Sequence, residues 1–241
     1  MLGEEPGMGV LAVVALVAGL LRGFTGFGGP AFLIAVLTIF YPPIMIVGKV
    51  LIVDFAASTF LFHSCFRRIQ WKPTLSLVIP SLLVMPAGQW LLVAMDPDVL
   101  ARGIAVTILL TSLMMLAGWR YRKRPGLVGM VLIGVISGVI FGASYIALVT
   151  ITAVLLGPWN HVEARTLIVA WAFLVQIWFT FISVYAGTVG SSDLLIAWPA
   201  AVLYLAGTWL GSRLFGGVGE AQYRNVALIV LAGLALAGLV R

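Results

Sequence analysis

Apolar residues fill almost the whole chain in long runs that short polar stretches separate. The runs lie at 8–40, 44–66, 74–95, 99–119, 127–156, 163–186, 194–212 and 224–240. Most of them have the ordinary length of a membrane-spanning helix, about 20 residues. A continuous helix over 8–40 would be about 50 Å long, and one over 127–156 about 45 Å. Because the hydrocarbon core of a bilayer is about 30 Å thick, both segments are too long for one straight helix.

Each of the two overlong segments contains a cluster of small residues near its middle. The first cluster reads Gly-Phe-Thr-Gly-Phe-Gly-Gly-Pro over residues 23–30, and the second lies within Gly134–Ser144. We therefore predict that each segment is two short helices joined by non-helical backbone. Lipid cannot satisfy the hydrogen bonds of such backbone, so it must be buried in protein or line a watery cavity. Paired interruptions in corresponding halves of an apolar chain are typical of a transport site.

The two halves of the chain also share residues in the same order. The matching pairs are Gly19 with Gly134, Gly23 with Gly138, Pro43 with Pro158, Lys49 with Arg165, Pro80 with Pro199, Trp90 with Trp209 and Arg102 with Arg224. The Pro, Trp and basic pairs carry most of the weight, because Gly is common in this chain. This order predicts two repeats, 8–119 and 127–240, inside one membrane domain that covers residues 1–241.

The basic residues favour a model in which each overlong segment is a hairpin that returns to its starting side. In that model the cytoplasmic residues are Arg67, Arg68, Lys72, Arg120, Arg122, Lys123, Arg124, Arg165, Arg213 and Arg224, against Lys49, Arg102 and Arg241 outside. Single crossings would move several of these cations outside, so the positive-inside rule prefers the hairpins. Each repeat then has a broken-helix hairpin plus three transmembrane helices. The predicted fold class is an all-α polytopic membrane protein with two inverted-topology repeats.

The composition narrows the class of function. Hydrophobic residues make up 62% of the chain and charged residues 9%, which leaves no room for a soluble catalytic domain. The net charge of +6 reflects basic cytoplasmic loops rather than nucleic-acid binding. The lone Cys65 provides neither a disulfide nor a metal framework. With no hydrolytic triad, phosphate loop or metal-ligand cluster in the sequence, we expect no enzyme, cofactor or metal site.

The first break is the strongest candidate for an anion site. Arg22 lies beside it, where a charge at membrane depth costs about 2.5–3.5 kcal/mol, so an anion or a carboxylate should compensate it. Successive glycines let the backbone approach a ligand, and helix N-termini can aim N–H groups at an anion. Tight helix packing is the alternative role of these glycines. The candidate substrate-binding residues are Arg22, Gly23, Thr25, Gly26, Gly28, Gly29, Pro30, Ser137, Gly138, Gly142, Ala143 and Ser144.

Asp54 is the one acidic residue predicted deep in a span, near the middle of 44–66. Two roles stay open for it, because intramembrane ionisable residues are usually functional yet commonly paired. It is either a proton or cation coupling group, or a counter-ion in a structural salt bridge with Arg22. Ser58 follows one helical turn later and could add a hydroxyl on the same face.

Three further polar residues are candidates for gating. Lys49 and Arg165 occupy matched positions about one turn into their helices, and the inverted model puts them on opposite sides of the membrane. They could attract an anion from either face, or they could simply extend to the membrane interface. Gln176 lies in the middle of its helix and could supply uncharged hydrogen bonds.

These features together resemble the TauE/SafE family of sulfite exporters. The resemblance covers essentially the whole chain and depends on the glycine-rich break over 23–30 with its weaker echo at Gly134–Ser144. It implies secondary transport of sulfite or an organosulfonate across the bacterial cytoplasmic membrane. The break positions that it carries over are Gly23, Gly26, Gly28, Gly29, Pro30, Gly138, Gly142, Ala143 and Ser144.

We therefore expect a secondary transporter of a small anion that works by alternating access, with the substrate between the two breaks near mid-membrane. Its expected partners are this anion, the lipid bilayer and a coupled proton or ion, and no nucleic acid. Two alternatives stay open: a passive anion channel built from paired half-helices, and, less favoured, an intramembrane enzyme. The sequence does not decide whether the chain assembles into a homo-oligomer.

Overall fold

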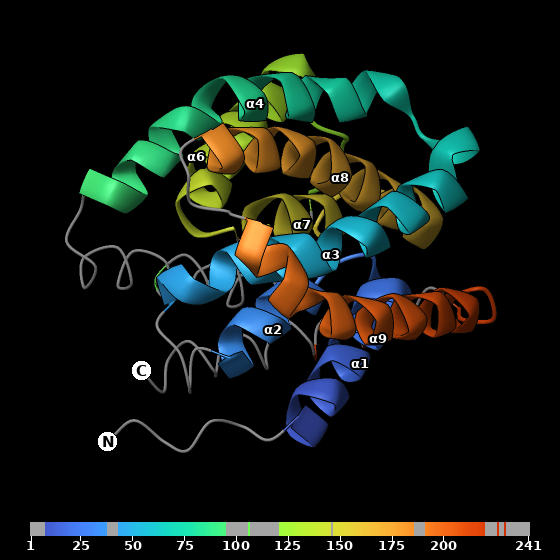
Figure 1. The fold of residues 1–241 in the computed structure, drawn as a ribbon. Helices are drawn as coiled ribbons and strands as arrows, with labels where there is room; N and C mark the ends of the chain where they lie inside the picture. The colour runs from blue at the N-terminus through green and yellow to red at the C-terminus, as the bar shows by residue number, and fades with distance from the viewer. Residues whose placement is uncertain are drawn as a thin grey trace.

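A computed structural model describes residues 8–37, 43–94, 121–145, 147–185 and 191–219, with the single positions 106, 226 and 229. Within these ranges every regular element is a helix (Figure 1). The elements are α1 Met8–Thr25, α2 Gly29–Leu37, α3 Pro43–Cys65, the 3-10 turn η1 Phe66–Arg68, α4 Trp71–Ala94, α6 Leu127–Ser144, α7 Leu148–Leu155, α8 His161–Tyr185 and α9 Ser191–Phe215. The predicted spans at 99–119 and 224–240 lie almost entirely outside the described residues.

Four stretches of the described helices are long and apolar enough to cross a bilayer. They are Gly48–Arg68, Trp71–Leu91, Leu127–Ser144 and His161–Tyr185. Large apolar side chains such as Leu83 and Trp90 on α4 and Val128 on α6 are exposed on the outside of the bundle, where lipid would cover them. The prediction of an all-helical, multi-pass membrane protein is therefore confirmed.

Helical structure stops inside both overlong segments. In the first, α1 ends at Thr25 and α2 begins at Gly29. In the second, α6 ends at Ser144 and α7 begins at Leu148. The first interruption lies within the predicted cluster, whereas the second lies directly after the cluster, because the small residues of Gly134–Ser144 are themselves helical.

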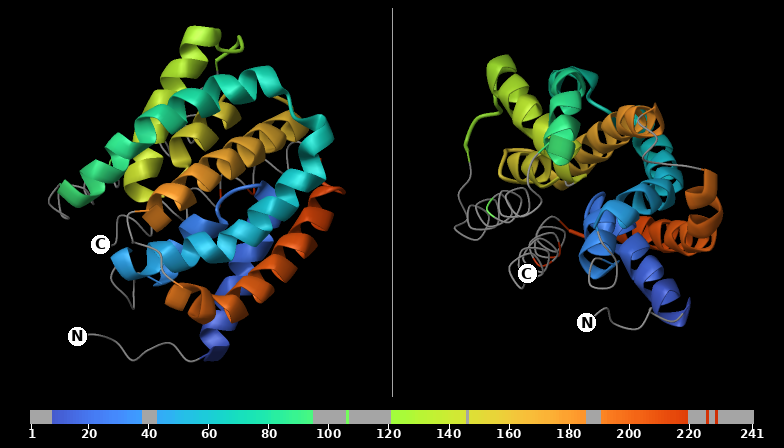
Figure 2. Two further views of the ribbon diagram at one scale, coloured as in Figure 1. Left: turned by 45° about the horizontal axis from the view of Figure 1, so that its top comes forward. Right: turned by 60° about the vertical axis from the view of Figure 1, so that its left-hand side comes forward.

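Two helix pairs with close backbone contact organise the bundle: α1 lies along α9, and α4 lies along α6 (Figure 2). At Gly19 on α1, a Cβ atom would collide with the backbone carbonyl of Tyr204 on α9. At Gly138 on α6, it would collide with the backbone carbonyl of Ser81 on α4. Small residues at these positions therefore let the helix backbones approach closely, as is common in membrane bundles.

The segment formed by α6 and α7 returns to the end of the molecule where it starts. Tyr121 precedes α6, and its N–H donates to the carbonyl of Leu156, directly after α7, at 3.3 Å. Neighbouring loops meet at the same end. Glu163, in the first turn of α8, pairs with Arg124 at 2.8 Å and accepts a hydrogen bond from the side chain of Gln70 at 2.8 Å. Loops from both halves of the chain thus share one end of the bundle.

Candidate functional site

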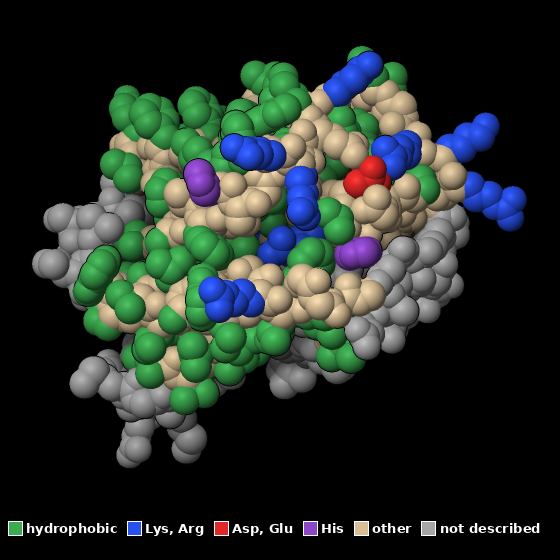
Figure 3. Space-filling view, turned by 90° about the vertical axis from the view of Figure 1, so that its right-hand side faces the viewer, with side chains coloured by type: hydrophobic (Ala, Val, Ile, Leu, Met, Phe, Trp, Pro, Cys, Tyr) green, Lys and Arg blue, Asp and Glu red, His purple; other side chains and the backbone are tan. Residues whose placement is uncertain are grey.

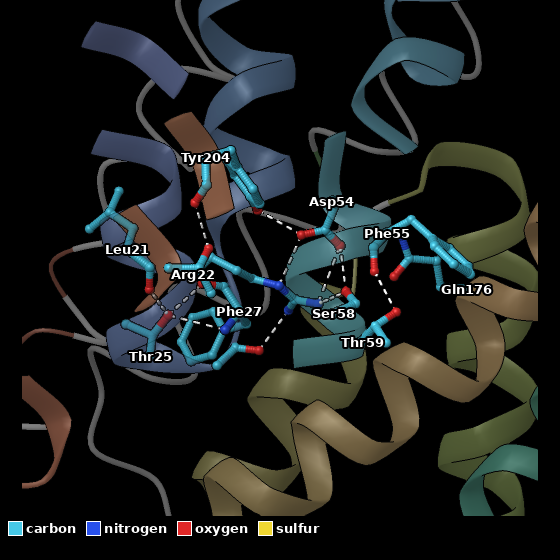
Figure 4. A network of polar contacts seen from close by, with 12 residues as sticks. Leu21, Arg22, Thr25, Phe27, Asp54, Phe55, Ser58, Thr59, Gln176 and Tyr204 are labelled. Atoms are coloured by element: carbon cyan, nitrogen blue, oxygen red, sulfur yellow. Dashed lines mark hydrogen bonds and ion pairs between the residues drawn. The ribbon is translucent and has the colours of Figure 1, made fainter. Parts of the chain in front are cut away.

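A buried ion pair joins α1 to α3 (Figure 4). Nε of Arg22 lies 3.0 Å from Oδ1 of Asp54, and the two side chains are 4% and 2% exposed. Arg22 also donates through Nη2 to Asp54 Oδ2 at 3.3 Å and to Ser58 Oγ at 2.6 Å, and through Nη1 to the Gly26 carbonyl at 2.6 Å. Asp54 further accepts from the Tyr204 hydroxyl at 2.6 Å and the Ser58 hydroxyl at 2.9 Å. The structure thus brings four predicted site residues together and adds Tyr204 from α9.

Arg22 and Asp54 together carry no net charge, although both side chains are buried away from water. An isolated charge at this depth would be expensive, whereas one that is paired with an opposite charge and hydrogen-bonded is tolerated. Nη1 and Nη2 of Arg22 donate to protein acceptors, and Nε forms the ion pair with Asp54 Oδ1. Oδ2 of Asp54 accepts two hydrogen bonds, and Oδ1 accepts one, from Tyr204. The ion pair therefore explains how the chain carries an arginine and an aspartate inside an apolar bundle.

A small cavity of about 40 Å³ lies against this pair, between the two interruptions. Gly28, Pro30 and Ala31 at the start of α2 line it, as do Ala147 and Leu148 at the start of α7. Both short helices therefore begin at the same cavity. Helix N-termini carry partial positive charge and unpaired N–H groups, so this arrangement favours a negatively charged occupant. The polar side chains on its wall are Arg22, Asp54, Tyr145 and Gln176.

The first break has a backbone that requires glycine. Gly26 and Gly28 have φ angles of 82° and 85°, a region that glycine enters without steric cost. The Thr25 hydroxyl holds the turn, because it accepts the N–H of Phe27 at 3.1 Å. At Gly29 any side chain would collide with the Tyr204 hydroxyl and with α1. These candidates therefore shape the break, while Gly28 and Pro30 also line the cavity.

The second set of candidates lies mostly away from the cavity. Cβ atoms at Gly138 and Gly142 would meet backbone carbonyls of α4, so these glycines pack helix against helix. Ser144 donates to the carbonyl of Ile140 at 2.7 Å, and Ser137 and Ala143 are buried on α6. No residue of the set Ser137, Gly138, Gly142, Ala143 and Ser144 lines the cavity.

Sequence reasoning missed two aromatic residues that the second half places at the cavity. Phe141 and Tyr145 line it, and their rings lie 5.0 Å apart. Tyr145 follows α6 directly and has a φ of 56°, which is rare outside glycine. Its position immediately after the last small residue was the available signal, but an aromatic residue in a membrane helix is ordinarily read as packing or an interface anchor.

The predicted gating residues occupy three different environments. Gln176 lines the cavity and donates from Nε2 to the Leu51 carbonyl at 3.3 Å, while its Oε1 is buried with no hydrogen bond from the described residues. Lys49 is half-buried on α3 and lines neither this cavity nor the basin described next. Arg165 is buried at the first break, where Nη2 donates to the Gly23 carbonyl at 2.6 Å.

A larger basin of about 330 Å³ opens where α3 and α9 end and α8 begins. Arg68, His161 and Arg165 contribute to its wall, together with Phe215. Figure 3 shows basic side chains gathered around a hollow on this face of the molecule. The guanidinium carbon of Arg165 lies 4.3 Å from the centroid of the Phe215 ring, a cation–π contact.

One helical turn separates the basin from the cavity. On α8, Arg165 and Thr166 line the basin, and Ile168 lines the cavity. Arg165 also contacts the first break, because its Cγ lies 3.0 Å from where a Cβ of Gly26 would be. The Arg165 side chain therefore stands between the two spaces.

Comparison with known proteins gives one match. Residues 11–238 match the family model described as Sulfite exporter TauE/SafE, and no curated protein and no solved structure matches the chain. The matched region contains both interruptions, the Arg22–Asp54 pair and the basin. Since the match covers nearly the whole sequence, the chain belongs to the sulfite exporter TauE/SafE family of membrane transporters.

Proposed function

We propose that this chain is a secondary transporter of the bacterial cytoplasmic membrane that moves sulfite or an organosulfonate by alternating access. The observation that carries the proposal is the single cavity at which α2 and α7 both begin and which Arg22 lines. Half-helices that meet at a central cavity are the usual way in which transporters bind a charged substrate inside a bilayer.

The charge around the cavity supports an anion as the occupant. Each helix N-terminus contributes the equivalent of roughly half a positive charge. Arg22 and Asp54 cancel each other, and Asp54 is the only acidic side chain among the described lining residues. The net charge around the cavity, with the helix N-termini included, is therefore positive. A volume of about 40 Å³ holds roughly three water molecules, at about 10–15 Å³ for each, which suits a compact anion.

The hydrogen bonds that already engage Arg22 support a proton-coupled mechanism. Its donors already serve Asp54, Ser58 and the Gly26 carbonyl, so an incoming anion must compete for them. Protonation of Asp54 would remove its negative charge and free the guanidinium for the substrate. We expect one proton to be taken up by the Asp54 carboxylate as the anion binds.

The two spaces support an alternating-access cycle. The basin lies at the end of the molecule that holds Arg68, Arg124 and Arg213, which the positive-inside rule assigns to the cytoplasm. Cations around the basin would raise the local concentration of the anion. Arg165 would act as the gate on this side. The inverted repeats would place Lys49 in the corresponding role on the other side, and the matched helix pairs α1–α9 and α4–α6 support that symmetry.

The test is anion binding to purified protein, measured by titration calorimetry with sulfite, sulfoacetate, thiosulfate and taurine. The decisive variant combines Arg22→Gln with Asp54→Asn, because it removes the arginine without leaving a buried charge unpaired. We expect it to weaken binding of the preferred anion by about 10–100-fold. Arg124→Gln, at an exposed surface pair, is the matched control and should bind normally. Unaltered binding by the double variant would overturn the site.

A flux assay in proteoliposomes separates the transporter from the passive channel. A transporter shows saturable uptake and counterflow, in which labelled anion accumulates against its gradient when unlabelled anion leaves. Flux that grows linearly with concentration and shows no counterflow would favour the channel.

A further inference from the structure

The two interruptions have the same backbone hydrogen-bond pattern, position for position. At the first, Gly26 N–H donates to the Arg22 carbonyl at 2.9 Å. At the second, Tyr145 N–H donates to the Phe141 carbonyl at 2.7 Å. The short helices also start alike, with Phe32 donating to Gly28 at 2.8 Å and Ile151 donating to Ala147 at 3.0 Å. By these bonds Tyr145 occupies the place of Gly26, and Phe141 occupies the place of Arg22.

The helix contacts extend this correspondence. This register differs by four residues from the sequence pairing of Gly19 with Gly134, and it puts Gly138 in the place of Gly19. Gly19 faces the Tyr204 carbonyl on α9, and Gly138 faces the Ser81 carbonyl on α4. The Tyr204 hydroxyl donates to Asp54, whereas the Ser81 hydroxyl accepts from the indole N–H of Trp171 at 3.0 Å.

The correspondence reveals a difference in chemistry between the halves. Arg22, Asp54 and Tyr204 form an ionic network in the first half. In the second half, Phe141 stands where Arg22 stands, and its ring lies edge to face with that of Trp171 at 5.5 Å between centroids. Among the described lining residues, the second half brings no charged side chain to the cavity.

Tyr145 is the exception to this apolar replacement. It is the one non-glycine residue with a positive φ in the described part of the chain. An L-residue with a side chain is strained in that region, and glycine fills the equivalent position 26. Strain of this kind persists where the surroundings hold it in place, and it clusters at ligand sites. The chain therefore keeps a tyrosine where glycine would be the less strained choice.

The surroundings of Tyr145 show what its side chain offers. Tyr145 is 4% exposed, and its ring packs between Phe141 and Phe179, at 5.0 Å between ring centroids in each case. The residue lines the cavity. No hydrogen bond joins its hydroxyl to another described residue, whereas the hydroxyls of Tyr204 and Tyr121 each have a protein acceptor. Buried tyrosine hydroxyls usually find a partner, so this one is available to a ligand.

We propose that the Tyr145 hydroxyl donates a hydrogen bond to an oxygen of the anion that Arg22 attracts, so that one anion bridges the two halves. This inference rests on the proposed function and adds a substrate-binding residue to the same site. The first half supplies charge, and the second supplies a neutral donor on a rigid aromatic support. The cavity then holds a single oxyanion per chain, bound by the Arg22 guanidinium from the first half and by the Tyr145 hydroxyl from the second.

Tyr145→Phe tests the proposal, because it removes the hydroxyl and retains the ring with its packing. Sulfite affinity, measured by titration calorimetry on the full chain, should fall about tenfold. The thermal unfolding midpoint should stay the same, since the hydroxyl has no partner among the described residues. The matched control is Tyr121→Phe, whose hydroxyl bonds the Ala153 carbonyl outside the cavity. It should leave sulfite affinity unchanged and lower the unfolding midpoint.

The outcomes separate this inference from the proposed function. If Tyr145→Phe binds sulfite as tightly as the unmodified chain, while the Arg22→Gln and Asp54→Asn double variant loses binding, the tyrosine assignment is wrong and the anion site stands. If neither changes binding, both are wrong. If sulfoacetate or thiosulfate proves to be the preferred anion, the same comparison is made with that anion as the probe.

Discussion

At the scale of single residues, the central feature is an arginine whose charge the protein itself neutralises. The sequence indicated Arg22, Asp54 and Ser58, because ionisable residues deep in apolar segments are rare and therefore conspicuous. It did not indicate Tyr204, which completes the network from α9. Tyrosine is common at membrane interfaces, and only the packing of α9 against α1 and α3 reveals that this hydroxyl reaches a buried carboxylate.

Asp54→Asn should separate anion binding from proton uptake. The amide keeps the shape of the carboxylate but has no charge with which to compete for Arg22. We expect sulfite affinity to rise about tenfold, corresponding to about 1.4 kcal/mol, and the proton uptake that accompanies binding to disappear. Calorimetry in buffers of different ionisation enthalpy measures both quantities. Glu163→Gln, at the surface, should retain the proton uptake, and retained uptake in Asp54→Asn would contradict the coupling role.

Ser58→Ala should destabilise the fold through the same network. Ser58 accepts from Arg22 at 2.6 Å and donates to Asp54 at 2.9 Å, so its loss leaves buried charged groups with fewer partners. The expected loss of unfolding free energy is about 1–3 kcal/mol. Thr59→Ala is the neighbouring control, because Thr59 is exposed and its hydroxyl bonds the Phe55 carbonyl of its own helix. Equal thermal midpoints for the two variants would show that the serine contributes nothing special.

At the scale of helices, the excessive length of the two segments predicted that each must break, and the structure shows the position of each break. The first break falls inside the glycine cluster, but the second falls between the end of α6 at Ser144 and the start of α7 at Leu148, beyond Gly142. The reason is the spacing of Gly134, Gly138 and Gly142, which repeats every four residues and forms one face of a helix. That face meets α4. A sequence alone does not say whether a glycine cluster serves a turn or a helix contact, because both need the missing Cβ.

Gly138→Ala should distinguish packing from substrate binding in α6. The new Cβ would collide with the backbone of Ser81, so α4 and α6 would have to move apart. We expect a loss of about 1–3 kcal/mol in unfolding free energy, as for other overpacked contacts, with sulfite affinity retained in the folded fraction. Gly126→Ala, where a Cβ would meet nothing within 4 Å, should leave stability unchanged. A folded Gly138→Ala protein that no longer bound sulfite would restore this glycine as a binding residue.

At the scale of the whole molecule, the distribution of basic residues predicted which helix ends lie together, which the composition alone did not. The hairpin model requires the ends of α3 and α9 and the start of α8 to lie together, and these three ends do surround the basin. The orientation in the membrane stays a prediction, as does the inverted relation of the repeats. The spans at 99–119 and 224–240, which would complete the repeats, lie outside the described residues.

Labelling with a membrane-impermeant maleimide tests this topology. In a Cys65→Ser background, Arg122→Cys and Arg213→Cys should react from the same side, in inverted vesicles and not in intact cells. The single-crossing model would put these two positions on opposite sides of the bilayer. Opposite labelling would therefore reject the hairpins.

The contact between Arg165 and the Gly23 carbonyl has a consequence for how the protein opens. This guanidinium nitrogen is bound to the negative end of α1, and an anion arriving in the basin would be a stronger acceptor than a neutral carbonyl. In the proposed cycle, the substrate anion would draw Arg165 away from the first break and so open the gate between the basin and the cavity. The gate would open more often as the anion concentration in the basin rises, so a transporter without substrate would stay closed and leak little.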